Sequence, residues 1–187
     1  MSDPFTANRF RWLDQIAADP SLSSQRTLAL AHEIASSGTI SALADSELDM
    51  FLTIPGIVGE SADEAHQDAI EIGSFSWGAF NDGSGAVAQD FVFTAPPSQA
   101  SVELFRAVAD GHPISQAVLS VRKSAGDLPE DFLSWTLSYI QITSYQTASD
   151  DGLLDTFSIG FGALEISYRP EGPDGQLDPP LTAEWDL

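Results

Sequence analysis

Short stretches in which every second residue is large and apolar recur from Asp49 to Leu187, and no other feature of the chain limits its fold as strongly. Two such stretches are Phe157, Ile159 and Phe161, and Val87, Phe91 and Phe93. A period of two places these side chains on one face of a β-strand, whereas a helix would need a period of about 3.6. We therefore expect most of this region to be β-sheet.

Apolar residues occupy both faces of several expected strands. After Phe161 the alternation continues from Leu164 in the opposite phase, and a shift of one residue exchanges the two faces of a strand. A β-bulge at Gly160 or Gly162 would absorb this shift. A longer stretch also has two apolar faces, with Leu133, Trp135, Leu137, Tyr139 and Tyr145 on one, and Phe132, Ile140 and Ile142 on the other. Such strands predict a barrel whose outer face is covered by a helix or by a neighbouring subunit.

One helix and one hairpin are expected within this region. Ser98 follows two prolines and is a typical N-cap, and Gly111 is a typical helix terminator, so we predict a helix from Ser98 to Asp110. Its predicted apolar stripe consists of Leu104, Phe105, Val108 and Ala109. The sequence Asp150-Asp151-Gly152 predicts a tight connection between two strands.

The first 47 residues have a different pattern. Asp3 and Pro4 favour the start of a helix that ends at Asp19-Pro20, and a second helix is expected to end at Gly38. The small, polar residues 39–47 are typical of a linker. We therefore predict an N-terminal helical hairpin and linker over residues 1–47, and a β-barrel domain over residues 48–187.

The charge of the chain limits its partners. It has 28 acidic and seven basic residues among 187, a net charge of −21 at pH 7. Nucleic-acid binding depends on basic residues that displace counterions from phosphates, so we expect no nucleic-acid partner. No apolar run is long enough for a signal peptide or a membrane span, and we expect no membrane insertion. The chain has no cysteine, so it has no disulfide or thiolate site.

Nothing in the sequence predicts catalysis. We expect His32 at a helix surface, His66 in a solvated polar loop, and His112 beside a helix C-terminus, whose dipole favours a partly positive ring. The adjacent acids Glu130-Asp131 and Asp150-Asp151 are expected to be solvated, because a raised carboxyl pKa requires burial. Since no nucleophile elbow, phosphate loop or zinc-helix motif is present, we predict no enzyme, no cofactor and no metal.

A series of motifs identifies a family resemblance. They are the opening 50–61 (MFLTIPGIVGES), Ile70-Glu71-Ile72, Ser74-Phe75-Ser76-Trp77-Gly78, Phe91-Val92-Phe93-Thr94, the helix 98–110, Gly111-His112-Pro113-Ile114, the strand from Ala117 to Lys123, and the closing Trp185-Asp186-Leu187. In this order and spacing, over roughly three quarters of the chain, they resemble the Hcp family, the tube protein of type VI secretion systems. Residues 1–47 have no counterpart in the usual tube subunit.

This resemblance implies a fold, an assembly and a set of partners. The fold is mainly β (α+β), a barrel of two sheets with one flanking helix. Six copies close into a ring, and stacked rings form a hollow tube with small effectors in its lumen, the spike protein VgrG at its tip and a contractile sheath around it. The resemblance also implies that the protein is made in the bacterial cytoplasm and is secreted by the injection machine to the extracellular space or the target cell.

The long polar segment 55–67 is our choice for the contact with an adjacent subunit. Its candidate interface residues are Ile57, Val58, Glu60, Ser61, His66 and Gln67. The alternative for this segment is a flexible loop without a partner.

An alternative function from another class is a binding module, for carbohydrate or as an adaptor, that shares the barrel without forming rings. Trp77, Trp135 and Trp185 could line such a binding face. The alternation instead places Trp77 and Trp135 among core residues. The oligomeric state distinguishes the two functions.

Overall fold

The computed structural model describes residues 48–81, 83–123, 130–149, 152–172 and 175–187. The predicted helices and linker of residues 1–47 lie outside this part of the chain, as do Asp150 and Asp151. The elements are β1 (Leu48–Thr53), β2 (Ile70–Glu71), β3 (Ser74–Ser76), β4 (Ala79–Asn81), β5 (Ala86–Ala88), β6 (Phe91–Ala95), α4 (Gln99–Asp110), β7 (Ile114–Lys123), β8 (Asp131–Ser149), β9 (Leu153–Gly160), β10 (Ala163–Tyr168) and β11 (Leu181–Asp186).

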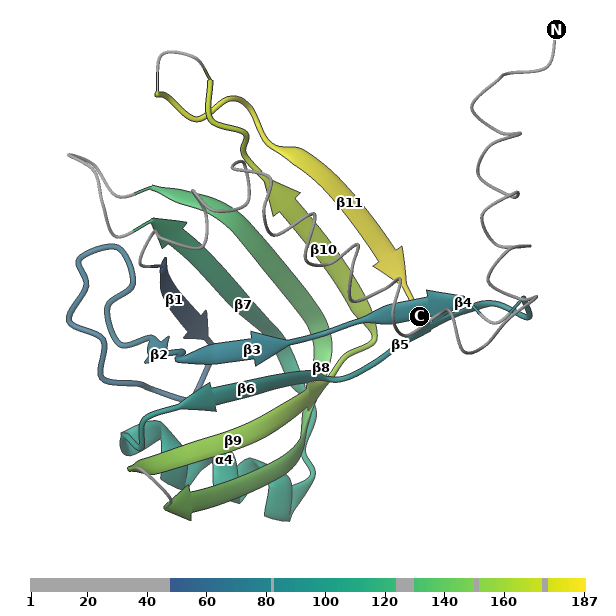
Figure 1. Ribbon diagram of the computed structural model, residues 1–187. Coiled ribbons are helices and arrows are strands. Elements are labelled where there is room, and N and C mark those ends of the chain that lie inside the picture. Colours follow the sequence, from purple (N-terminus) through teal and green to yellow (C-terminus); the bar gives the residue numbers. More distant parts are fainter. Residues whose placement is uncertain (1–47, 82, 124–129, 150–151, 173–174) are drawn as a thin grey trace, which may run out of the picture. The chain divides into compact units, whose positions relative to one another are not determined.

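The strands form a barrel that one short segment closes (Figure 1). Antiparallel pairs join β1 to β7, β7 to β8, β8 to β9 and β9 to β6. The segment 70–76 then pairs with both edges, because β2 pairs with β1 and β3 pairs with β6. Between them the Ile72 amide donates to Met50 and the Gly73 amide to Thr94. The predicted mainly β barrel with one flanking helix is confirmed.

The barrel has two sheets, one with β1, β2, β7, β10 and β11 and the other with β3, β6 and β9. The 19-residue strand β8 belongs to both sheets. Its first half pairs with β7 and β10, and its second half with β9, while β11 extends the first sheet beyond β10. Tyr139, between the halves, has a φ of 55°. A residue in the left-handed region interrupts the alternation of a strand. The buried positions therefore change from Trp135 and Leu137 to Ile140 and Ile142.

Two predictions about this corner were wrong. Tyr139 was expected on the same face as Leu137, but its backbone turns it outward and 77% of it is exposed. The phase change after Phe161 is a break between β9 and β10 rather than a bulge. A bulge is present instead in the β8–β9 pair, where it lies in β8 between Ile142 and Ser144.

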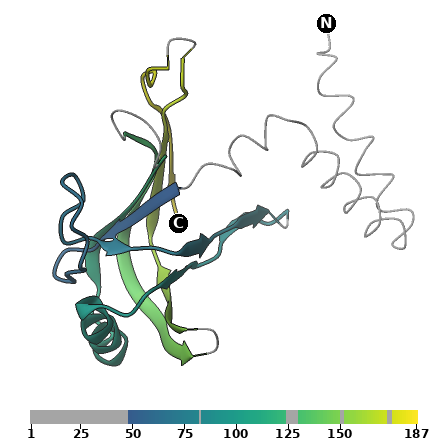
Figure 2. The same ribbon diagram turned by 60° about the vertical axis from the view of Figure 1, so that its left-hand side comes forward.

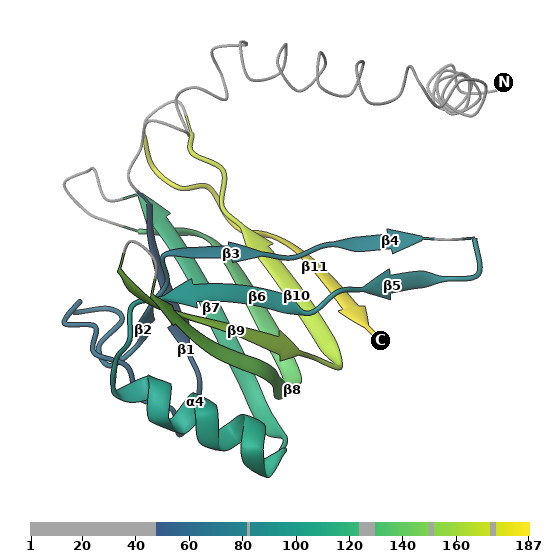
Figure 3. The same ribbon diagram turned by 60° about the horizontal axis from the view of Figure 1, so that its bottom comes forward.

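An aromatic cluster fills the barrel. Phe91, Phe93 and Phe157 are fully buried, Trp135 is 9% exposed, and Trp77 stacks on Phe91 with ring centroids 5.2 Å apart. The core positions predicted for Trp77 and Trp135 are confirmed. Val87 is an exception to the predicted alternation: it lies with Phe80 on the β4–β5 hairpin, which projects from the barrel (Figure 3), and it is 41% exposed.

Helix α4 lies across one end of the barrel, against β8 (Figure 3). Ser98 is its N-cap and forms a capping box with Ser101, and Gly111 ends it in the left-handed conformation, so the predicted bounds are confirmed. The buried positions are Ala100 and Leu104. Phe105 and Ala109 were predicted in the buried stripe but are exposed, because the sheet contacts the helix along a narrower line of residues.

A buried carboxylate attaches α4 to the β8–β9 hairpin. Asp155 is 2% exposed and accepts hydrogen bonds from the hydroxyls of Ser101 and Thr147, the latter at 2.7 Å. Because Ser101 also accepts from the Ser98 amide, the carboxylate orients the capping box itself.

Candidate functional site

The outer face of β1 is covered by the chain's own loop. Phe51 and Leu52 are adjacent, point to opposite faces of the strand, and are 5% and 0% exposed. Leu52 faces the core, whereas Phe51 lies on the outside. Residues 55–69, which we name the strap, cover that side (Figure 2). The outer face was expected to be covered by a helix or by a neighbouring subunit, but over Phe51 the chain's own loop covers it.

The strap has its own hydrogen bonds. The Gly59 amide donates to the Asp68 carbonyl at 2.7 Å, the Ser61 amide to Ala69 at 3.1 Å, and the Asp68 amide to Ser61 at 3.0 Å. Asp68 has a φ of 62° at the turn. These bonds give the strap a defined internal structure, and its contact with an adjacent subunit stays a prediction.

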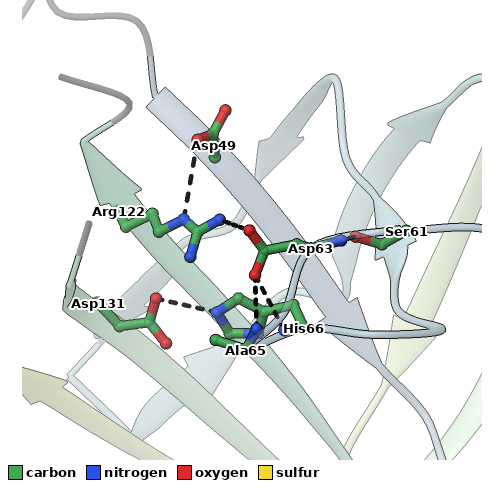
Figure 4. Close-up of polar contacts among 7 residues, drawn as sticks. All are labelled: Asp49, Ser61, Asp63, Ala65, His66, Arg122 and Asp131. Atoms are coloured by element: carbon green, nitrogen blue, oxygen red, sulfur yellow. Dashed lines mark hydrogen bonds and ion pairs between the residues drawn. The ribbon is translucent and has the colours of Figure 1, made fainter. Parts of the chain in front are cut away.

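Arg122 binds the strap to the barrel (Figure 4). It lies on β7, is 5% exposed, and donates from Nη2 to the carboxylate of Asp63 in the strap. Its Nε atom lies 3.7 Å from Asp49 of β1 and has no hydrogen bond. Its guanidinium carbon lies 4.8 Å from the centroid of the Phe51 ring, a cation–π contact. One cation on β7 thus contacts groups of both β1 and the strap.

The charge of Arg122 changes the acidity of its partner. The hydrogen bond from Arg122 holds the pKa of Asp63 below its ordinary value of 3.8, and the amides of Ala65 and His66 act in the same direction. In return, the hydrogen bond to Asp63 raises the pKa of Arg122. Both groups are therefore charged at neutral pH.

His66 forms the second attachment of the strap. Its ring stacks on Phe51, with centroids 4.4 Å apart and planes 9° from parallel. Its Nε2 atom lies 3.0 Å from a carboxylate oxygen of Asp131 on β8, and its side chain is 11% exposed. His66 was predicted to be solvated, and this prediction is wrong. Its ring packs on Phe51 because the apolar Phe51 ring lies outside the barrel and is stabilised by burial. Asp131, also expected to be solvated, is the partner of His66.

A third attachment joins the strap to α4. The Gln99 amide donates to the Glu60 carboxylate at 2.9 Å, and the Gln99 side chain donates to the Gly59 carbonyl. Glu60 thereby satisfies an amide of the first helical turn, where negative charge is also favoured by the helix dipole.

The predicted interface residues differ in their exposure. Ile57 and Ser61 are 7% and 3% exposed, and His66 contacts Phe51 and Asp131. Val58 is 46% exposed, and Glu60 and Gln67 are also exposed. Among the six predicted residues, these three therefore have the exposed side chains.

Sequence reasoning missed four groups that bind the strap: Asp49, Asp63, Arg122 and Asp131. Arg122 carried a usable signal. It follows the core positions Leu119 and Val121 in the alternation, so its place on the outer face of its strand could have been predicted. The pairing of β1 with β7, which brings Asp49 opposite Arg122, joins segments far apart in the sequence.

The side chains of Asp49, Asp63, His66, Arg122 and Asp131 hold the strap on the barrel. Within the described residues, no group of three or more histidine and acidic side chains is arranged to hold a metal ion. His112 is exposed, and its expected interaction with the helix dipole stays a prediction. No helix in the described ranges has both the length and the apolar character to cross a membrane.

The family model described as "Type VI secretion system effector, Hcp" matches residues 51–168, most of the barrel. The chain belongs to the Hcp family. It is 29% identical over 154 residues to Protein hcp1 of Pseudomonas aeruginosa, an alignment that covers 75% of this chain and 95% of that protein.

Solved structures agree with this assignment. The crystal structure of Hcp1 from Salmonella typhimurium is 28% identical, has a TM-score of 0.65, and covers 74% of this chain and 94% of its own. A structure described as a type six secretion system protein has a TM-score of 0.70 at 24% identity, with 75% and 96% coverage, and shows the shared fold. Membership of the Hcp family supports a role as a type VI secretion tube protein.

Proposed function

We propose that this Hcp chain is the subunit of a hexameric ring, and that rings stack into a hollow tube that is secreted by a contractile injection machine. The family match over the barrel is the observation that carries this proposal. The spike protein VgrG, a contractile sheath and small effectors are the partners of such a tube. The function is mechanical, and the protein leaves the bacterium through the machine itself.

The strap is the segment we propose to contact the adjacent subunit. Val58, Glu60 and Gln67 present their side chains outward from it, while Ile57, Ser61 and His66 hold it in shape from beneath. A contact between different surfaces of two copies closes into a ring when the rotation between them fits. A strap that is already ordered loses little entropy when it meets a neighbour.

Light scattering coupled to size exclusion tests the ring. The expected mass is about six times the 20.0 kDa of the chain, and electron micrographs of the same fraction should show annular particles. A single-chain mass at every salt concentration would instead favour the binding-module alternative. The substitution Val58→Asp should lower the ring fraction, whereas Val102→Asp, at an exposed position on α4, serves as the matched control.

A further inference from the structure

The strap has backbone hydrogen bonds of its own. Three of these bonds join residues 59 and 61 to residues 68 and 69 of the same segment. These bonds do not depend on the barrel. By contrast, the ladder bonds of β1 and β7 continue beneath the strap without its participation. Lifting the part of the strap beyond Ile57, which belongs to the core, therefore breaks its contacts with the barrel and with Gln99 of α4 but no strand pairing.

Over Phe51 the strap is held by the ring of His66, which stacks on Phe51, and by a set of charged groups. The charged and titratable groups that meet there are Asp49 from β1, Asp63 and His66 from the strap, Arg122 from β7 and Asp131 from β8 (Figure 4). Three carboxylates thus surround one guanidinium and one imidazole. Charge-assisted hydrogen bonds are stronger than neutral ones, and they weaken when salt screens the charges.

We propose that the strap is a latch that opens independently of the barrel, and that the Asp63–Arg122 ion pair is its main fastening. When the latch is closed, the strap covers Phe51 and shields His66; when it is open, both become accessible to solvent. Because the strap is also the segment proposed to reach the adjacent subunit, the consequence for assembly rests on the proposed function. The opening itself does not.

Two histidines of the chain provide an internal probe. The His66 side chain is 11% exposed beneath the strap, whereas His112 is exposed beyond the end of α4. Diethyl pyrocarbonate modifies accessible imidazoles, and peptide mass spectrometry gives the rate at each. In the full chain at constant pH, we expect His66 to react more slowly than His112. Equal rates would overturn the latch.

The substitution Asp63→Asn tests the fastening, with Glu64→Gln as a control that removes the same charge from an exposed neighbour. We expect the rate at His66 to rise about tenfold in Asp63→Asn, since a charge-assisted hydrogen bond is lost. The modification rate at His112 should not change. In Glu64→Gln, the rate at His66 should equal that in the unaltered chain. Amide hydrogen exchange in β7 and β8 should also stay constant. An unchanged rate at His66, or a rise in β7 and β8 exchange of the same size, would refute the proposal.

The unaltered chain gives an independent answer if the variant does not fold. Raising sodium chloride at constant pH should speed modification of His66 while β7 and β8 exchange stays constant, because Asp63 is 24% exposed and salt partly screens its charge, whereas the strand ladder is uncharged. A His66 rate that salt leaves unchanged would contradict the proposal. Light scattering on the same samples reports the ring separately, so failure of the latch and failure of the hexamer give different results.

Discussion

At the scale of single residues, Arg122 determines how the strap meets the barrel. A guanidinium can donate in several directions within one plane, which a lysine ammonium cannot reproduce. Here one nitrogen donates to Asp63, while the whole group lies against the Phe51 ring. Asp63 accepts in addition from the amides of Ala65 and His66, so a single carboxylate shapes the strap and fastens it.

The lowered pKa of Asp63 predicts a pH dependence. Since its pKa in the folded chain lies below the ordinary value of 3.8, ionised Asp63 stabilises the fold. This contribution is complete above the ordinary pKa and is lost as the pH falls through the lowered one. The difference in melting temperature between the unaltered chain and Asp63→Asn should stay constant from pH 8 to about 5 and shrink below about 4. Calorimetry checks this, and a change centred near neutral pH would contradict it.

Removal of the buried Asp155 carboxylate should lower stability more than removal of an exposed acidic side chain. Its carboxylate is buried, and Asp155→Ala leaves the hydroxyls of Ser101 and Thr147 without their acceptor. We expect a loss of about 2–3 kcal/mol in the free energy of unfolding, measured by denaturant titration. The control Asp178→Ala removes an exposed acidic side chain and should cost about 0.5 kcal/mol or less. Equal losses in both variants would mean that the buried network contributes nothing.

At the scale of elements, the strap depends on the close approach of its two ends. A Cβ atom added at Gly59 would lie 2.1 Å from the Ala69 carbonyl oxygen, a backbone atom that cannot move alone. Gly59 is therefore required for geometric reasons rather than for flexibility.

Gly59→Ala should separate the ends of the strap. We expect a loss of about 1–3 kcal/mol in the free energy of unfolding, as for other overpacked sites. Gly85→Ala is the control, because nothing lies within 4 Å of its added Cβ. Chemical denaturation of both variants measures the difference, and a Gly59→Ala chain as stable as Gly85→Ala would show that the strap is not packed as described.

The β10–β11 pair contains an unfavourable contact that can be removed. Glu165 lies directly opposite Glu184 in the register of these strands, and like charges in such positions repel. Each of Glu165→Gln and Glu184→Gln should therefore stabilise the chain by about 0.2–1 kcal/mol. The double variant should gain less than the sum of the two, because either change already removes the repulsion. A double-mutant cycle at low salt tests this, and additive effects would refute it.

The elements differ in how far the sequence predicted them. The bounds of α4 follow from Ser98 and Gly111, since caps act through local backbone geometry. Its buried face was predicted too broadly, because how much of a helix contacts a sheet depends on the sheet. Phe105 illustrates this: it lies edge-on to Tyr145, with centroids 6.3 Å apart, and still leaves 62% of itself exposed.

At the scale of the whole molecule, negative charge dominates. Residues 48–187 contain 22 acidic and four basic residues, a net charge of −18. Arg106, Arg122 and Arg169 each form an ion pair within the chain. These arginines are therefore already engaged when two copies meet, and most of the opposing charges have the same sign.

Assembly should consequently tighten as salt is added. Repulsion between copies is screened over about 8 Å at physiological ionic strength and over shorter distances in more salt. We expect the oligomer fraction at fixed protein concentration and pH to rise with sodium chloride, measured by sedimentation velocity. Dissociation on adding salt would show that attractive charge pairs hold the copies together.

The sequence by itself determined the class of the barrel, the helix caps and the family, because alternation, capping and ordered motifs are local patterns. The tertiary structure decided which residues share a surface. Arg122, Asp49 and Asp63 meet because β1 pairs with β7 and the strap folds across both. It also decided that Tyr139 points outward and His66 inward. Such contacts join residues distant in the chain, and their energies depend on burial that a sequence pattern does not specify.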